Sequence, residues 1–147
     1  MSNEELRALA HGAALHDVGK SKVDQNVLNK QGKLDDEEFR HIKQHAAFGF
    51  DILQDSANKE DKRVLSAVRH HHEKMDGSGY PDGLSGGSIS PYAKIVAIAD
   101  VFDALNTKRC YKEPMPTFDT LMLMKNQMGN HIDVDILKAF IMCMCGK

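Results

Sequence analysis

Apolar residues recur at helical spacing along most of the chain, and no segment alternates apolar and polar residues as a half-buried strand would. This spacing is typical of helices that bury one face. Segments with glycine and proline separate the helical stretches, above all residues 76–87. We therefore expect an all-α fold, a compact bundle of about six or seven helices. The expected helices cover residues 4–18, 35–53, 59–72, 91–105, 118–128 and 134–144.

The length of 147 residues fits a single domain, residues 1–147, whose core needs no disulfide or structural metal. The 19 basic and 21 acidic residues are mixed along the chain and give a formal net charge of −2. The absence of a basic stripe argues against nucleic acid as a partner. No apolar run is long enough for a membrane span, and the first residues do not resemble a signal sequence. We expect a cytoplasmic protein with reduced cysteines.

Histidines and aspartates occupy positions where ordinary surface helices carry lysine or glutamate. Six of them stand at helix ends or on polar helix faces: His16, Asp17, His45, His71, His72 and Asp100. Taken singly, each is more often a solvated or hydrogen-bonded side chain than a ligand. Together they provide imidazole and carboxylate groups, which suit divalent transition metals such as Fe, Mn, Zn or Ni. Adjacent helical residues point about 100° apart, so each dipeptide can serve two neighbouring metals.

The sequence also offers two alternative metal sites, one with two histidines and one with two cysteines. His41 and His45, one helical turn apart, form a competing zinc pair on one helix face. Cys143-x-Cys145 has the form of half a metal clip, although a thiol pair inside an apolar helix is more often part of a core. Both readings use fewer of the unusual residues than the six-residue set does.

Four segments in order resemble the HD-GYP family of the HD superfamily. They are Ala14-Leu-His-Asp-Val-Gly-Lys20, His45-x-x-x-Gly49, His71-His-Glu-Lys-Met-Asp-Gly-Ser-Gly-Tyr-Pro-Asp-Gly-Leu84 and Ile98-Ala-Asp-Val-Phe-Asp-Ala-Leu105. The resemblance runs from Leu9 to the last expected helix. It implies a helical bundle of the HD-domain type, Fe or Mn in a bi- or trinuclear centre, and a cyclic di-GMP phosphodiesterase activity.

Carried over position by position, the resemblance also implies the roles of single residues. The implied metal ligands are His16, Asp17, His45, His71, His72 and Asp100, with Asp17 bridging two metals. Lys20 is implied to neutralise a phosphate oxygen during attack, and Tyr80 to stand beside the site. Arg109 and Lys112 resemble the family's Arg-Pro-Tyr-Lys contacts to phosphate and guanine. Cys110 replaces the proline of that motif, so the loop loses a fixed φ.

The reaction implied is attack of a metal-bridging hydroxide on a phosphorus of cyclic di-GMP, giving linear pGpG and, after a second cut, GMP. Asp17 and Lys20 are the implied catalytic residues. One alternative is an HD hydrolase of another nucleotide, because the Gly-Tyr-Pro loop alone does not fix the base. A second is a metal-poor module that binds a cyclic dinucleotide or a partner protein. A GGDEF-type diguanylate cyclase and an upstream sensory domain are the partners that such a module suggests.

The start of the chain leads to a further expectation about the metal centre. HD-GYP domains usually have a helix before the His-Asp helix, and that helix supplies another histidine to the centre. Fifteen residues precede His16, and the helix that delivers it uses them all. His11 lies about 140° round the helix from His16 and is a poor substitute. We therefore expect a truncated domain with incomplete metal loading, low turnover and an exposed apolar groove at the missing helix.

Overall fold

The computed structural model describes residues 1–55, 61–107, 114–144 and 146, and these form helices joined by turns and loops, with no strand. The expected all-α fold is thus confirmed. No helix in these ranges is long and apolar enough to cross a membrane. The α-helices are α1 (Asn3–Leu15), α2 (Gln25–Leu28), α3 (Asp36–Lys43), α4 (His45–Gln54), α5 (Lys62–His70), α6 (Pro91–Asn106), α7 (Thr117–Gln127) and α8 (Val134–Met144), with 3₁₀ turns η1 (Val18–Lys22) and η2 (Gly86–Ser88).

Capping side chains set the starts of several helices. The side chains of Ser2 and Asp35 each accept a hydrogen bond from a backbone N–H in the first turn of their helix. The side chains of Glu5 and Glu38 accept one in return from the backbone N–H of Ser2 and Asp35, which completes a capping box at each helix. Ser90 caps α6, whose first residue is Pro91. Proline fits this position because the first helical N–H has no partner within the helix. The starts of α1, α3 and α6 are therefore encoded locally.

Two expectations about the helices were wrong. The segment expected as one helix over residues 35–53 is broken at Gln44, where α3 ends and α4 begins. In α1, the apolar spacing favours Leu6 on the buried face, but Leu6 is exposed, and Ala8 and Gly12 are buried instead. Gly12 lies so close to Ala67 of α5 that a Cβ atom on it would be 2.8 Å away. Small residues thus let the two helices pack closely, and this contact outweighs the leucine pattern.

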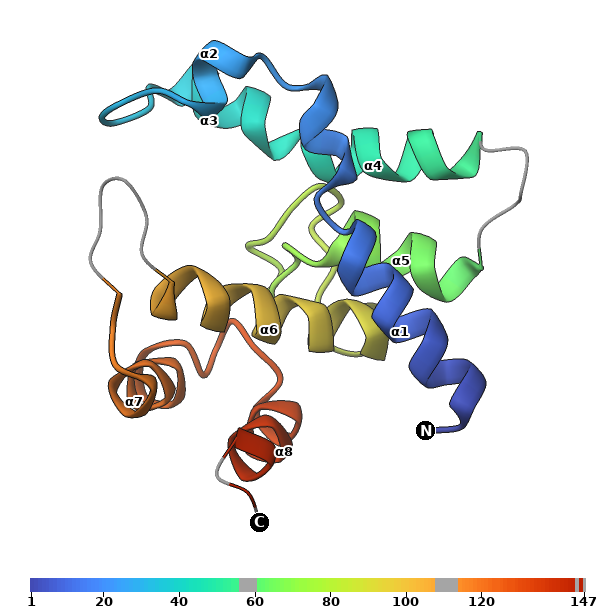
Figure 1. Ribbon diagram of the computed structural model, residues 1–147, viewed down its shortest axis with the longest axis vertical. Coiled ribbons are helices and arrows are strands. Elements are labelled where there is room, and N and C mark those ends of the chain that lie inside the picture. The colour runs from blue at the N-terminus through green and yellow to red at the C-terminus, as the bar shows by residue number, and fades with distance from the viewer. Residues whose placement is uncertain (56–60, 108–113, 145, 147) are drawn as a thin grey trace.

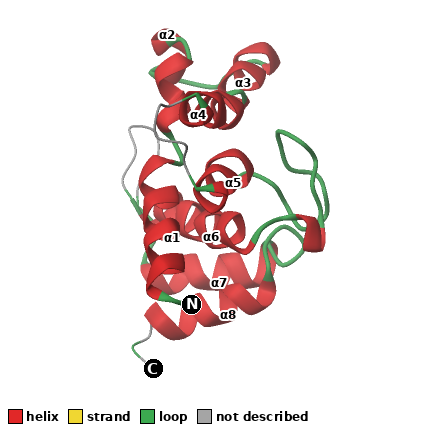
Figure 2. Ribbon diagram, turned by 90° about the vertical axis from the view of Figure 1, so that its right-hand side faces the viewer, coloured by secondary structure: helices red, strands yellow, loops and turns green. Residues whose placement is uncertain are grey.

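The helices form three groups along the molecule (Figure 1). α2 and α3 lie at one end, α7 and α8 at the other, and α1, α4, α5 and α6 lie between them. One core cluster joins α1, α4 and α5, and a second joins α6, α7 and α8. The loop between α5 and α6 extends along one side of the bundle (Figure 2). His45 and Asp100 lie on helices of the central group, and His16-Asp17 and His71-His72 directly follow α1 and α5 of the same group.

Gly19 fixes how closely η1 approaches α4. A Cβ atom on Gly19 would lie 1.9 Å from the carbonyl oxygen of His45 and 2.4 Å from the amide nitrogen of Gly49. Backbone atoms make both contacts, so no side-chain rotation relieves them. We expect Gly19→Ala to lower the free energy of unfolding by about 3 kcal/mol in urea denaturation.

Gly129→Ala is the matched control, because a Cβ atom there would lie 3.9 Å from its nearest neighbour, the carbonyl oxygen of Lys125. Its unfolding free energy should change by less than about 1 kcal/mol. Equal stability of the Gly19 and Gly129 variants would show that η1 and α4 move apart freely.

Candidate metal centre

Six side chains from four parts of the chain meet where the central helices converge. α1 ends just before His16-Asp17; α4 begins at His45; α5 ends just before His71-His72; and Asp100 lies on α6. The Nε2 atom of His16 lies 3.4 Å from an oxygen of Asp17 and 3.8 Å from one of Asp100. The rings of His71 and His72 have centroids 4.1 Å apart. The six residues expected to act together are therefore neighbours in space.

The ligand atoms of the cluster form two groups that share one residue. His45, His71 and His72 offer one set of atoms within 4.8 Å of one another. His16, Asp17 and His71 offer the other. Because His71 belongs to both, the two groups are adjacent, with the Nε2 atoms of His45 and His71 3.3 Å apart. The cluster is thus able to bind metal, with a donor set of neutral nitrogen and carboxylate oxygen that suits transition metals.

Three of the histidines are oriented by the same backbone contact. The Nδ1 atoms of His16, His45 and His71 each lie 2.7–2.8 Å from the carbonyl oxygen three residues earlier. A carbonyl only accepts, so Nδ1 carries the proton in each ring. In His45 and His71, Nε2 is then the free ligand atom of the neutral ring and points into the cluster, whereas Nε2 of His16 faces Asp17. A histidine whose other nitrogen is held in this way is the usual form of a metal ligand.

The carboxylate of Asp17 lies between two histidines and a lysine. One oxygen is 3.5 Å from Nε2 of His45, and the other is 3.4 Å from Nε2 of His16. The second oxygen also accepts a hydrogen bond from the Lys20 ammonium at 2.5 Å. Burial raises the pKa of Asp17, but hydrogen bonds from His16 and Lys20 outweigh it and hold the pKa well below its ordinary value. Asp17 is therefore ionised at neutral pH.

Burial keeps three of the histidines uncharged. It lowers the pKa of His71, and also that of His72, to about 3, with repulsion from neighbouring rings adding to the effect. The pKa of His45 is lowered mainly by burial as well. His16 differs, because its hydrogen bond to Asp17 outweighs burial and raises its pKa. The buried rings are thus in the neutral form that binds metals at pH 7.

Comparison with known proteins places this arrangement in a family. The family model described as "HD domain" matches residues 1–136. The chain belongs to the HD domain family. Its relatives include the cyclic di-GMP phosphodiesterase response regulator RpfG of Xanthomonas campestris, 40% identical over 100% of this chain and 40% of that protein. The 3'3'-cGAMP-specific phosphodiesterase 3 of Vibrio cholerae is 41% identical over 89% of this chain and 28% of its own length.

A solved structure has the same fold. The HDG"Y"P protein Bd1817 of Bdellovibrio bacteriovorus superposes with a TM-score of 0.78 and 22% identity, covering 99% of this chain and 46% of that chain. The HD-GYP resemblance expected from the motifs is confirmed. The HD domain described here spans 40% or less of the two curated relatives named above.

A hollow beside the cluster opens between α1 and α6 of the HD domain. Its volume is about 260 Å³. The lining residues are Ala13, His16, Asp17, Val96, Ala99, Asp100 and Asp103. Asp103 lies on α6 one turn after Asp100, and its carboxylate accepts a hydrogen bond from the Thr107 hydroxyl. The hollow gives a small ligand access to His16 and Asp17.

Tyr80 reaches the cluster from the loop between α5 and α6. Its ring stacks on His72, with centroids 4.7 Å apart and planes 28° from parallel. Burial raises the pKa of the Tyr80 hydroxyl, with the charge of Asp100 adding to the effect, so the group stays protonated. Tyr80 therefore presents an aromatic face and a hydroxyl donor beside the histidines.

Two carboxylates outside the predicted set hold this loop in place. Buried Glu73 accepts hydrogen bonds from the backbone N–H groups of Asp82, at 2.7 Å, and Leu84, at 3.0 Å. The Asp82 carboxylate pairs with the Arg69 guanidinium through two contacts of 2.8 Å. Sequence reasoning missed these residues, although Glu73 directly follows the His-His pair in the motif. A charged residue next to two ligand histidines was the available signal.

We expect Glu73→Gln to weaken nucleotide binding while leaving metal in place. An amide oxygen can accept one of the two loop N–H groups, but the amide NH₂ then faces the other. Losing a charge-assisted hydrogen bond of this kind costs about 1.5–3 kcal/mol, and the loop that carries Tyr80 loses its fixed position. Tested with cyclic di-GMP, the substrate in the name of the relative RpfG, the Michaelis constant should rise about tenfold, and the metal content should stay at the wild-type level.

Asp76→Asn in the same loop is the control, because Asp76 is exposed and its carboxylate contacts Ser78 and, at 3.6 Å, Nε2 of His131, and not the N–H groups of Asp82 and Leu84. Its kinetics should match those of the wild type. A Glu73 variant that loses metal but keeps its Michaelis constant would mean that Glu73 supports His72 and not the loop.

The remaining predicted residues lie elsewhere or outside the described ranges. The Nε2 atom of His41 accepts from the Asp24 backbone N–H, while Nε2 of His45 faces His71, so the two rings do not form the zinc pair. Arg109 and Lys112 fall outside the described residues, as does Cys145. The substrate contacts expected from Arg109 and Lys112 therefore remain predictions.

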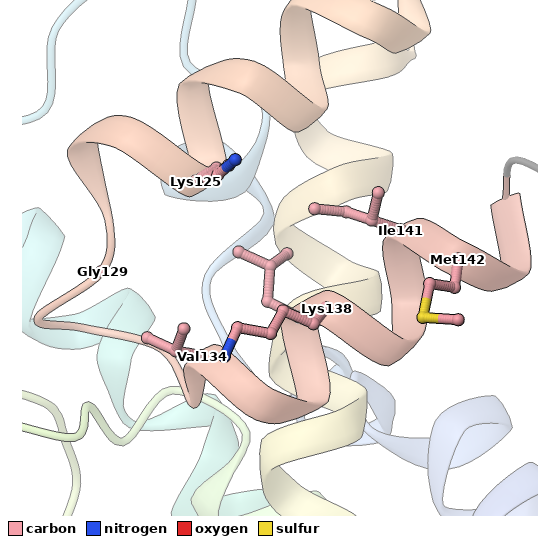
Figure 3. A pocket seen from close by; sticks show the side chains of 7 residues that line it. Lys125, Gly129, Val134, Lys138, Ile141 and Met142 are labelled. Carbon is pink, nitrogen blue, oxygen red and sulfur yellow. The ribbon is translucent and has the colours of Figure 1, made fainter.

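A second hollow, between α7 and α8, carries no ligand chemistry. Its volume is about 320 Å³, and apolar side chains of α8 form most of its wall. Figure 3 shows Val134, Ile141 and Met142 around it, with Lys125 and Lys138 nearby. None of its lining residues is a histidine, cysteine or carboxylate. This hollow is therefore not a candidate metal site.

Proposed function

We propose that the HD domain is a metal-dependent phosphodiesterase that hydrolyses cyclic di-GMP to linear pGpG and then GMP. The observation that carries this proposal is the pair of adjacent ligand groups that share His71, with Asp17 set between two histidines. Paired metal sites of this kind are typical of enzymes that cleave phosphate esters. The printed names of the relatives, which are cyclic di-GMP and 3'3'-cGAMP phosphodiesterases, support the same reaction class.

The six clustered residues would hold two divalent metals, with Fe or Mn as our choice. His45, His71 and His72 would hold one metal, and His16 and Asp17 would hold the other, with Asp100 within reach of His16. Asp17 is the residue best placed to bridge them, because its two oxygens face different histidines. When bound, the metals would lower the pKa of a water and neutralise phosphate charge.

The chain's own side chains would then hold the substrate. Lys20 is 42% exposed and sits on Asp17, so its ammonium is accessible to a phosphate oxygen at the edge of the cluster. As negative charge grows on that oxygen during attack, the ammonium would stabilise it. Tyr80 would donate its hydroxyl proton in a hydrogen bond to the substrate, while its ring packs against His72. Arg109 and Lys112 would add contacts to phosphate and guanine.

The test is turnover on a panel of substrates after anaerobic loading with Mn²⁺ or Fe²⁺. The panel holds cyclic di-GMP, 3'3'-cGAMP, cyclic di-AMP and a guanosine tetraphosphate alarmone, with products separated by chromatography. We expect cleavage of cyclic di-GMP to pGpG above the metal-free background. Turnover of the alarmone alone, or of none of the four, would reject the proposed function.

A further inference from the structure

A lysine on α3 lies between two aromatic rings beside the cluster. The Nζ atom of Lys43 is 4.6 Å from the ring centroid of Phe39 and 5.3 Å from that of Tyr80. Phe39 and Lys43 are one helical turn apart, so their contact is an ordinary one. The contact with Tyr80 is not local, because it joins α3 to the loop whose tyrosine stacks on His72. Lys43 therefore belongs to the edge of the candidate centre.

The ammonium of Lys43 faces aromatic rings, whereas several lysines of the bundle pair with a carboxylate. Lys20, Lys30 and Lys94 each pair with a carboxylate. No carboxylate in the described part of the chain forms an ion pair with Lys43, whose ammonium faces the two rings. The Phe39 side chain is 48% exposed, so its ring is accessible to a ligand. Together they form an accessible surface with an aromatic face and a positive charge, here called the α3 edge (Phe39, Lys43 and Tyr80).

The α3 edge has the chemistry of a base-binding site rather than a phosphate-binding site. Ring faces carry negative electrostatic potential, so they repel phosphate and accept a stacked base. An ammonium only donates hydrogen bonds. Guanine presents two acceptors, O6 and N7, on one edge, whereas adenine presents N7 beside an amino donor. A lysine at this place therefore favours guanine.

We propose that the α3 edge binds one guanine base of the cyclic dinucleotide, with Phe39 stacking on the base and Lys43 donating to its O6 and N7 atoms. This assignment rests on the proposed function, which places a phosphodiester at the metals. One nucleotide unit then joins the phosphate at the cluster to a base at the α3 edge. Lys43 would thus discriminate guanine from adenine without touching the reacting phosphate.

The experiment compares the affinities of three ligands for the metal-loaded chain by calorimetry: cyclic di-GMP, 3'3'-cGAMP and cyclic di-AMP. Lys43→Met keeps the length of the side chain and removes its charge. We expect the affinity for cyclic di-GMP to fall about tenfold, while that for cyclic di-AMP changes by less than about twofold. Lys43→Arg should restore most of the affinity for cyclic di-GMP, because arginine also donates to O6 and N7.

Two further variants separate the contributions. Phe39→Leu should weaken all three ligands and Phe39→Tyr should not, because stacking does not depend on the base. Lys33→Met removes a charge from an exposed loop and should bind as the wild type does. Metal content and melting temperature of every variant are measured in parallel.

Three results would overturn the assignment. Unchanged affinity of Lys43→Met for cyclic di-GMP would show that Lys43 does not reach the ligand. An equal loss for all three ligands would show a general charge effect on phosphate. Wild-type chain that binds and cleaves none of them would reject the proposed function itself, and this outcome is distinct because it appears before any variant is compared.

Discussion

Asp17→Asn is expected to lose bound metal and with it cyclic di-GMP hydrolysis. The wild-type carboxylate offers one oxygen to the side of His16 and the other to the side of His45. Asparagine keeps the shape but supplies one neutral oxygen and an NH₂ group that repels a cation. Since mutating even the groups that only orient metal ligands typically costs 10–100-fold in metal affinity, we expect at least about a hundredfold loss here. Activity should fall below detection.

The measurement is elemental analysis of the anaerobically loaded and desalted variant, with activity assayed on the same sample. Asp51→Asn is the control, because Asp51 is an exposed carboxylate on α4, the helix that also carries His45. It should keep wild-type metal and turnover. An Asp17→Asn variant with two metals per chain would contradict the bridging role.

Single histidine substitutions should remove different numbers of metals. His71 belongs to both ligand groups, whereas His16 and His72 each belong to one. Only Nε2 of His71 is free to bind a metal, but its ring packs against those of His16, His45 and His72. We therefore expect His71→Ala to disturb both sites and His16→Ala or His72→Ala to leave about one metal per chain. Hydrolysis should be lost in all three, because one metal cannot serve both sides of the phosphate.

His71 is buried, so its alanine variant also leaves a cavity and loses a hydrogen bond to the Val68 carbonyl. A circular-dichroism melt of each metal-free variant separates unfolding from loss of ligands. His41→Ala is the histidine control and should keep both metals. If all three cluster variants lost metal equally, the cluster would act as a single site and not as two that share His71.

The ends of helices explain why the cluster could be predicted from the sequence. His16 and His71 follow the last turns of α1 and α5, and periodicity locates such ends to within a few residues. The expected end of the first helix, near residue 18, was still too late, because Asp17 leaves the helix and η1 begins. That change of backbone direction brings Asp17 between two histidines.

Packing and orientation could not be predicted in the same way. Gly19 is only one residue in a motif until the carbonyl of His45 is found where its Cβ would be. The orientation of each histidine depends on a carbonyl three residues earlier, and Glu73 acts through the backbone of a loop nine residues on. The break at Gln44 was missed because the apolar spacing continues across it. These features depend on three-dimensional contacts that a pattern does not contain.

The most direct test of the account is a titration of the metal-free chain with Mn²⁺ under anaerobic conditions, with bound metal and cyclic di-GMP cleavage measured at each step. We predict two binding events per chain, the second weaker than the first, and a low rate of cleavage that rises with the second. Cleavage that is complete with one metal bound, or that proceeds without metal, would contradict the paired centre built on Asp17 and His71.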